Sequence, residues 1–271
     1  MIIDCNGIAL NCLDEGQGEP VVLLHGHSLD LRVWDDVVPE LLHAGFRTIR
    51  YDQRGHGRSS SPTQGYRWGD HAADLAAVIE RLEAAPAHVL ALSKGGGIAL
   101  ELALRRPELV ASLALVGPLV PDFALSSELV GSFREFARAI RTTGVAAAVR
   151  SAWLGHPLIA SAAALPGARE KLEAMLLTFP AGEYLATARD EPDRDWKLTA
   201  RLAQIVAPVL VASGDREVPD FAAMARLVAE KVPGARLEVI RECGHLVPLE
   251  RPGELGSLVV AFLRGEVPHR P

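Results

Sequence analysis

The chain has 271 residues, of which 49% are hydrophobic and 23% are charged, a composition typical of a folded globular protein rather than a disordered one. Lys and Arg number 28 and Asp and Glu number 34, so the net charge of −6 gives no reason to expect binding to nucleic acid or an anionic membrane. The cysteines Cys5, Cys12 and Cys243 cannot all pair and match no zinc motif, which predicts free thiols in the cytoplasm. We expect neither a signal peptide nor a membrane span, which needs an apolar run of roughly 18 residues.

Residues 1–20 alternate in polarity and turn at Asn6-Gly7, which predicts an antiparallel hairpin at the edge of a sheet. Beyond them, short apolar runs alternate with amphipathic stretches. The apolar runs predict buried strands at Val21–His25, Arg47–Asp52, His88–Leu92, Leu113–Val116, Val209–Ala212 and Leu237–Ile240. The amphipathic stretches predict helices at Trp34–Ala44, Asp70–Ala84, Gly96–Arg106, Asp220–Lys231 and Pro248–Arg264. This alternation predicts an α/β fold with a mostly parallel sheet and helices on both faces.

The alternation stops between residues 120 and 195, where the sequence contains no convincing strand. Stretches interrupted by prolines predict helices there at Ser126–Thr142, Val145–Trp153, Ala168–Phe179 and Glu183–Arg189. Because a segment of this length is too long for a loop, we expect a helical cap inserted after the sixth strand. Residues 1–119 and 196–271 then form the core, and residues 120–195 form the cap.

The turn between the predicted strand His88–Leu92 and the predicted helix after it contains Ser93, with Ala91 and Gly95 on either side. A serine in such a tight strand-to-helix turn exposes its hydroxyl above the sheet, and the turn requires small residues two positions away. A serine can also cap a helix at this place. Other motifs of the chain favour a nucleophile.

A serine hydroxyl becomes a nucleophile when a base removes its proton, and that base is most often a histidine oriented by a carboxylate. His245 follows the last predicted strand, so we expect it at the same edge of the sheet as Ser93. The acid is expected after the preceding strand, in the loop Ser213–Asp220. The residues alone leave Asp215 and Glu217 open.

Acyl transfer also needs two backbone N–H groups directed at the developing oxyanion. One is expected at Lys94, directly after the serine, and the other at His27, in the loop after the strand Val21–His25. The chain order is then oxyanion loop, serine, acid and histidine, and each of these groups follows a predicted strand. This combined order is far more specific than any one motif.

Together these motifs resemble the α/β-hydrolase superfamily, and in particular its lid-bearing serine hydrolases, such as enol-lactonases, meta-cleavage-product hydrolases and haloperoxidase-like esterases. The resemblance rests on the stretches LLHGHSLDLRVWDDVVP, RTIRYDQRGHGRSS, AHVLALSKGGGIALELALRRPELV, APVLVASGDREVPD and ECGHLVPLERP. It implies the α/β-hydrolase fold for the core. Through the family's Gly-x-x-Asp pattern it favours Glu217 over Asp215 as the acid. In some relatives the acid follows the preceding strand instead, where this chain has Asp122.

The resemblance also implies that Asp52 and Arg54 shape the turn beside the nucleophile, and that the cap supplies much of the substrate pocket. Three aromatic side chains of the predicted cap are the candidate substrate contacts: Trp153, Phe123 and Phe136. Lys94 stands where relatives often carry Met or Gln. Its side chain either attracts an anionic substrate or pairs with a nearby carboxylate.

We therefore expect a serine hydrolase that cleaves a carboxylic ester of a small molecule through an acyl-enzyme intermediate, with no metal and no cofactor. The alternatives are an enol-lactonase or another hydrolase of a small anionic metabolite, a carbon–carbon bond hydrolase, and a non-catalytic ligand receptor. A small-molecule ester or lactone is the expected partner, whereas nucleic acid and membrane are not expected. A homodimer is left open.

Overall fold

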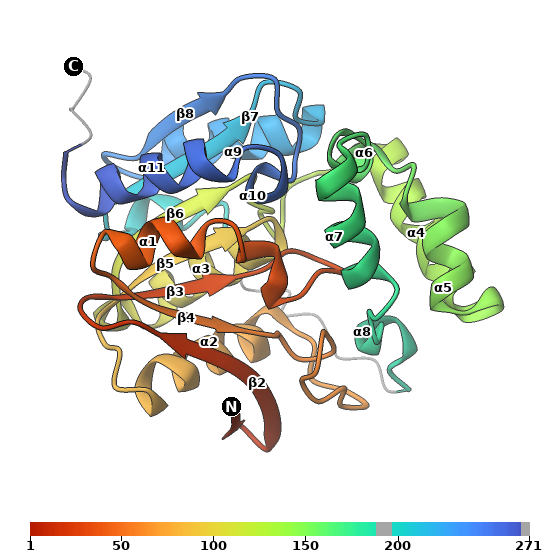
Figure 1. The fold of residues 1–271 in the computed structure, drawn as a ribbon, viewed down its shortest axis with the longest axis horizontal. Helices are drawn as coiled ribbons and strands as arrows, with labels where there is room; N and C mark the ends of the chain where they lie inside the picture. Colours follow the sequence, from red (N-terminus) through yellow and green to blue (C-terminus); the bar gives the residue numbers. More distant parts are fainter. Residues whose placement is uncertain (188–196, 267–271) are drawn as a thin grey trace.

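The computed structural model describes residues 1–187 and 197–266 and contains one eight-stranded sheet in the order β1-β2-β4-β3-β5-β6-β7-β8 (Figure 1). The hairpin β1-β2 is antiparallel, β2 pairs antiparallel with β4, and the remaining pairs are parallel. The predicted edge hairpin and mostly parallel sheet are therefore confirmed. The strands are β1 (Ile2–Cys5), β2 (Ile8–Glu15), β3 (Pro20–Leu24), β4 (Arg47–Tyr51), β5 (Ala87–Leu92), β6 (Val110–Val116), β7 (Val209–Gly214) and β8 (Arg236–Ile240).

Helices cover both faces of this sheet. α1 packs against α11 on one face, and α2 packs against α3 on the other (Figure 1). Because both faces are covered, the central strands β3 and β5 are buried on each side, which explains their nearly continuous apolar sequences. The core helices are α1 (Val38–His43), α2 (Trp68–Arg81), α3 (Lys94–Arg105), α9 (Pro219–Lys231), α10 (Val247–Glu250) and α11 (Pro252–Leu263).

A second group of helices lies between β6 and β7 in the chain and stands beyond the carboxyl ends of the parallel strands (Figure 1). Its position agrees with the expected cap, whose boundary at residues 195 and 196 involves residues outside the described ones. The predicted helix Glu183–Arg189 is shorter in the structure, because α8 ends at Leu185 and Ala186 has a non-helical conformation; the last two residues of the prediction lie outside the described ones. The helices of this group are α4 (Ser127–Thr143), α5 (Val145–Ala148), a π-helical turn (Val149–Trp153), α6 (Pro157–Ala163), α7 (Pro166–Leu176) and α8 (Gly182–Leu185).

Prolines account for the main differences between the predicted and observed helices. The predicted helix Pro248–Arg264 is two helices, because Pro252 holds Arg251 in a non-helical conformation with φ −141° and ψ 55°. The predicted helix Trp34–Ala44 is a 3-10 turn (Leu31–Trp34) followed by α1, in which Pro39 occupies the first turn. The short helix α6 is absent from the prediction and also begins at a proline.

The three cysteines are buried and unpaired. In residues 1–187 and 197–266, no helix combines the length and the hydropathy needed to cross a bilayer.

Candidate active site

Ser93 lies between the last residue of β5 and the first residue of α3, in a strained backbone conformation with φ 54° and ψ −116°. Such a conformation is rare for a residue with a side chain and marks functional turns. The turn lies close to the neighbouring strand β3, because a Cβ atom at Gly95 would stand 2.8 Å from the carbonyl oxygens of both Leu24 and His25. The expected need for a small residue at Gly95 is thus confirmed.

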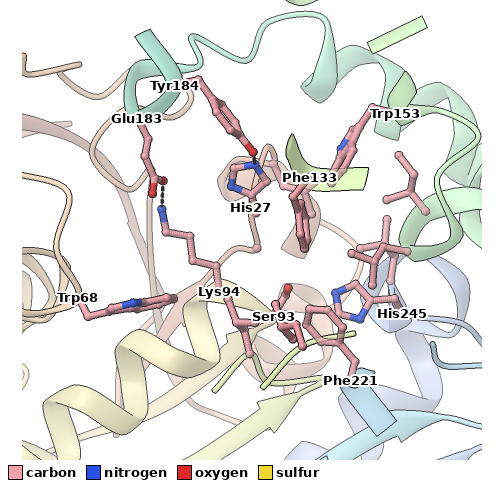
Figure 2. A pocket seen from close by; sticks show the side chains of 17 residues that line it. His27, Trp68, Ser93, Lys94, Phe133, Trp153, Glu183, Tyr184, Phe221 and His245 are labelled. Atoms are coloured by element: carbon pink, nitrogen blue, oxygen red, sulfur yellow. Dashed lines mark hydrogen bonds and ion pairs between the residues drawn. The ribbon is translucent and has the colours of Figure 1, made fainter. Parts of the chain in front are cut away.

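His245 is held by Glu217, which lies in the loop after β7. The Nδ1 atom of His245 donates to the Glu217 Oε2 atom at 2.8 Å, and both side chains are almost fully buried, with exposed fractions of 4% and 1%. This bond leaves Nε2 as the free nitrogen of the imidazole ring. His245 and Ser93 line the same cavity and lie side by side in Figure 2.

The other two candidate acids lie elsewhere. Asp215 is exposed, and its carboxylate accepts a hydrogen bond from the backbone N–H of Cys243 at 3.1 Å, which braces the loop that carries the histidine. Asp122 accepts from the backbone and hydroxyl of Thr199 at 3.0 and 2.6 Å. Of the three carboxylates, Glu217 is therefore the one bonded to His245.

Glu250 is a further residue of this site that sequence reasoning missed. Its buried carboxylate accepts from the backbone N–H groups on both sides of the histidine, Gly244 at 2.8 Å and Leu246 at 3.2 Å. It also accepts from the hydroxyl of Ser161, on α6, at 2.5 Å. The available signal was its place in the helical turn five residues after His245, within the stretch GHLVPLE.

His27 and Lys94, the expected sources of the oxyanion N–H groups, line the same cavity as Ser93. The His27 ring is enclosed by aromatic side chains, including Phe133 and Phe179. Its Nε2 atom bonds the Tyr184 hydroxyl at 2.7 Å (Figure 2). Burial, followed by the nearby Lys94 ammonium, lowers the pKa of His27 to about 4. The ring is therefore a neutral wall of the cavity near pH 7.

The oxyanion loop is tied to the cap through Ser28 and Trp153. The indole N–H of Trp153 donates to the Ser28 hydroxyl at 2.9 Å, and that hydroxyl donates to the carbonyl oxygen of His27 at 2.6 Å. Ser28 also has a positive φ of 60°, so the loop turns sharply at this residue. A side chain of the cap thus fixes the conformation of the loop that carries the candidate oxyanion donor.

The cavity has a volume of about 230 Å³ and is lined mainly by apolar side chains. Of the three predicted substrate contacts, Trp153 lines it, but Phe123 and Phe136 do not. Phe136 is fully buried and stacks on Trp153 with ring centroids 4.3 Å apart, so the indole stands between it and the cavity. Phe123 packs against the hydrophobic core instead. The structure therefore places these two predicted residues outside the cavity lining, and the phenylalanine of α4 that lines the cavity is Phe133.

The side chain of Lys94 is also part of the lining, and only 6% of it is exposed. Its Nζ atom lies 2.5 Å from the Oε2 atom of Glu183, on α8 (Figure 2). Of the two expectations for Lys94, the structure agrees with pairing to a nearby carboxylate.

Asp52 and Arg54 stabilise the turn after β4, as the resemblance implied. Asp52 accepts from the backbone N–H groups of Leu31 and Arg58, both at 2.9 Å. Arg54 forms a bidentate pair with Asp74 at 2.6 and 2.7 Å.

In the part of the chain that the structure describes, no three His, Cys, Asp or Glu side chains are grouped so that they could hold a metal ion.

Comparisons with known proteins agree with the fold described above. A family model described as the alpha/beta hydrolase fold matches residues 19–252. The 2-hydroxymuconate semialdehyde hydrolase of Pseudomonas sp. (strain CF600) is 31% identical over 95% of this chain and 91% of its own. A thermophilic esterase from Thermogutta terrifontis has a TM-score of 0.82 at 26% identity and covers 98% of both chains. An N-acyl homoserine lactone degrading enzyme has a TM-score of 0.76 at 30% identity and covers 98% of this chain and 100% of its own.

Proposed function

Because this chain belongs to the alpha/beta hydrolase fold family, we propose that it is a serine hydrolase that cleaves a carboxylic ester of a small molecule through an acyl-enzyme intermediate. The observation that carries this proposal is the bond between His245 and Glu217 beside a serine in a strained turn, with all three groups at the carboxyl edge of the sheet. A base oriented in this way is what a serine needs to become a nucleophile.

In the first half-reaction, the Nε2 atom of His245 takes the proton of the Ser93 hydroxyl while the serine oxygen attacks the ester carbonyl carbon. Glu217 holds the ring in the required tautomer and stabilises the imidazolium that forms. The backbone N–H groups of His27 and Lys94 donate to the oxyanion. The tetrahedral intermediate then collapses, and the imidazolium gives its proton to the departing alkoxide.

In the second half-reaction, water replaces the alcohol. His245 takes a proton from that water, the hydroxide attacks the acyl carbon, and the bond to Ser93 breaks as the imidazolium returns the proton to the serine oxygen. The products are the free acid and the unmodified enzyme. The apolar lining supplied by Trp153, Phe133 and Phe221 excludes bulk water and receives the acyl or alcohol part of the substrate.

A lactone is the second candidate substrate, because a cyclic ester reacts by the same two steps and the 30% identical relative degrades N-acyl homoserine lactones. In that case the alcohol stays attached to the acid, and the ring simply opens.

Hydrolysis of p-nitrophenyl esters of increasing acyl length, measured beside lactones, tests the proposal. We expect turnover by the wild type and a loss of roughly 10³-fold or more in kcat for Ser93→Ala, because the nucleophile is removed. Thr143→Ala, on the exposed end of α4, is the matched hydroxyl control and should behave as the wild type. Equal turnover by the wild type and Ser93→Ala would contradict the proposal.

A further inference from the structure

The cavity beside Ser93 is lined mainly by apolar side chains, and at one end the cap and the core each contribute a charge. Apart from the two histidines, the described lining has one basic side chain, Lys94 from the first turn of α3, and one acidic side chain, Glu183 from α8. Their Nζ and Oε2 atoms are 2.5 Å apart. In Figure 2 the lysine side chain extends away from His245 toward the cap. The pair therefore lies at the end of the cavity remote from the catalytic base.

An ammonium group as buried as that of Lys94 needs a counter-charge, because its transfer out of water is costly. A lysine without a partner would obtain that charge from the substrate and would select carboxylate-bearing molecules. With Glu183 in place, the pair has no net charge. A substrate carboxylate at this end would have to displace Glu183 or lie beside it, and like charges at such short range repel strongly.

Glu183 is held in its position by its neighbours in the chain. The next residue, Tyr184, bonds His27 through its hydroxyl at 2.7 Å, and the preceding residue, Gly182, donates its backbone N–H to the Gly55 carbonyl at 3.4 Å. A Cβ atom on Gly182 would stand 2.6 Å from the Tyr66 hydroxyl, so α8 lies directly against the core. The carboxylate is thus placed over Lys94 by contacts on both sides of it.

We propose that Glu183 determines the charge selectivity of this site: by occupying the Lys94 ammonium group, it restricts the enzyme to esters that are uncharged at the end remote from the reacting carbonyl. This inference rests on the proposed ester hydrolysis. The pocket therefore rejects small anionic metabolites, which are the substrates of the alternative function.

The test compares two esters of equal length, methyl hexanoate and monomethyl adipate, which differ in a terminal methyl or carboxylate group. The readout is the ratio of kcat/KM for the anionic ester to that for the neutral ester. We expect a low ratio in the wild type and an increase of about tenfold or more in Glu183→Gln, because the freed ammonium attracts the carboxylate. The added change Lys94→Met should return the ratio of Glu183→Gln to a low value.

Glu173→Gln is the matched control, since it removes one negative charge from the cap at a residue paired with Arg169 outside the cavity. It should leave the ratio unchanged. Lys94→Met alone supplies a second test that does not depend on the folding of Glu183→Gln. It removes the ammonium group and keeps the Glu183 carboxylate, so the ratio for monomethyl adipate over methyl hexanoate should be no higher than in the wild type, and a higher ratio would contradict the inference.

A wild type that hydrolyses both esters equally well, or a Glu183→Gln ratio equal to that of the wild type and Glu173→Gln, would overturn the inference while leaving ester hydrolysis intact. Failure of the wild type to hydrolyse any ester would instead overturn the proposed function, and this inference with it.

Discussion

At the scale of single residues, the choice of acid decides how His245 is oriented. Glu217 is one methylene longer than the aspartate of the family pattern, yet its Oε2 atom lies 2.8 Å from Nδ1 of His245. Gly117 provides the room for this contact, because a Cβ atom there would stand 2.8 Å from the Glu217 carboxylate and 3.0 Å from His245 Nδ1. The histidine and its acid therefore pack against bare backbone at the end of β6.

Single substitutions distinguish the contributions of Glu217 and Asp215, the two carboxylates of this loop, to the reaction. Glu217→Gln should lower kcat by roughly 10³- to 10⁴-fold, because an amide neither fixes the required tautomer nor stabilises the imidazolium. Asp215→Asn removes an exposed carboxylate from the same loop and should keep kcat within about threefold of the wild type. Steady-state kinetics on one p-nitrophenyl ester checks both. The assignment of Glu217 fails if Asp215→Asn is the more damaging change.

At the scale of elements, the carboxylate of Glu250 stabilises the conformation of the loop between β8 and α10. Glu250 accepts from the peptide groups of Gly244 and Leu246, which flank the histidine, and from Ser161 on α6. The loop that carries His245 is thus bonded both to its own helix and to the cap. We interpret Glu250 as a positioning residue that acts through the backbone of the histidine.

Glu250→Ala leaves two buried N–H groups without an acceptor and should destabilise the fold by about 2 to 4 kcal/mol. It should also lower kcat by about tenfold or more with little change in KM, because the base is displaced while the pocket remains. Ser161→Ala removes only the bond to the cap and is the matched control. Urea unfolding and steady-state kinetics check the two effects, and a Glu250→Ala enzyme with wild-type kcat would show that the residue is only structural.

At the scale of the whole molecule, a buried ion pair joins three distant parts of the chain. Arg54, after β4, pairs with Asp74 of α2, and their side chains are 7% and 2% exposed. Asp74 also accepts from the side chain of Asn6, at the turn between β1 and β2, at 3.0 Å. The edge hairpin, the helix α2 and the turn after β4 are thereby held together.

Asp74→Asn leaves the Arg54 guanidinium buried without its counter-charge and should cost about 3 to 5 kcal/mol of the free energy of unfolding. Glu80→Gln, in the same helix, breaks an exposed pair with Arg106 and should cost less than about 1 kcal/mol. Urea denaturation of the three proteins compares them directly. An equal loss of unfolding free energy in the two variants would contradict the stabilising role of the buried pair.

The fold was largely predictable from the sequence, because the apolar runs coincide with the buried strands of the sheet. The proximity of Ser93 and His245 was also predictable, because both follow strands whose carboxyl ends meet at one edge. Their roles as nucleophile and base stay predictions. The positions of Phe123, Phe136 and Glu183 depend on how the cap packs on the core. Periodicity shows that Phe136 faces inward on a helix, but not that Trp153 stands between it and the cavity. Contacts between distant segments, such as that of Ser161 with Glu250, leave no local pattern in the sequence.

The most direct test of the central claim is the reaction of the protein with a fluorophosphonate, followed by intact-mass measurement and mapping of the modified peptide. The account predicts one phosphonyl group per chain, attached to Ser93, formed by the wild type and by Asp215→Asn but not by Ser93→Ala. It also predicts much slower labelling of Glu217→Gln, because the base that activates the serine is misoriented. A wild type that remains unmodified, or that is modified at the same rate after Ser93→Ala, would contradict the assignment of Ser93 as the nucleophile.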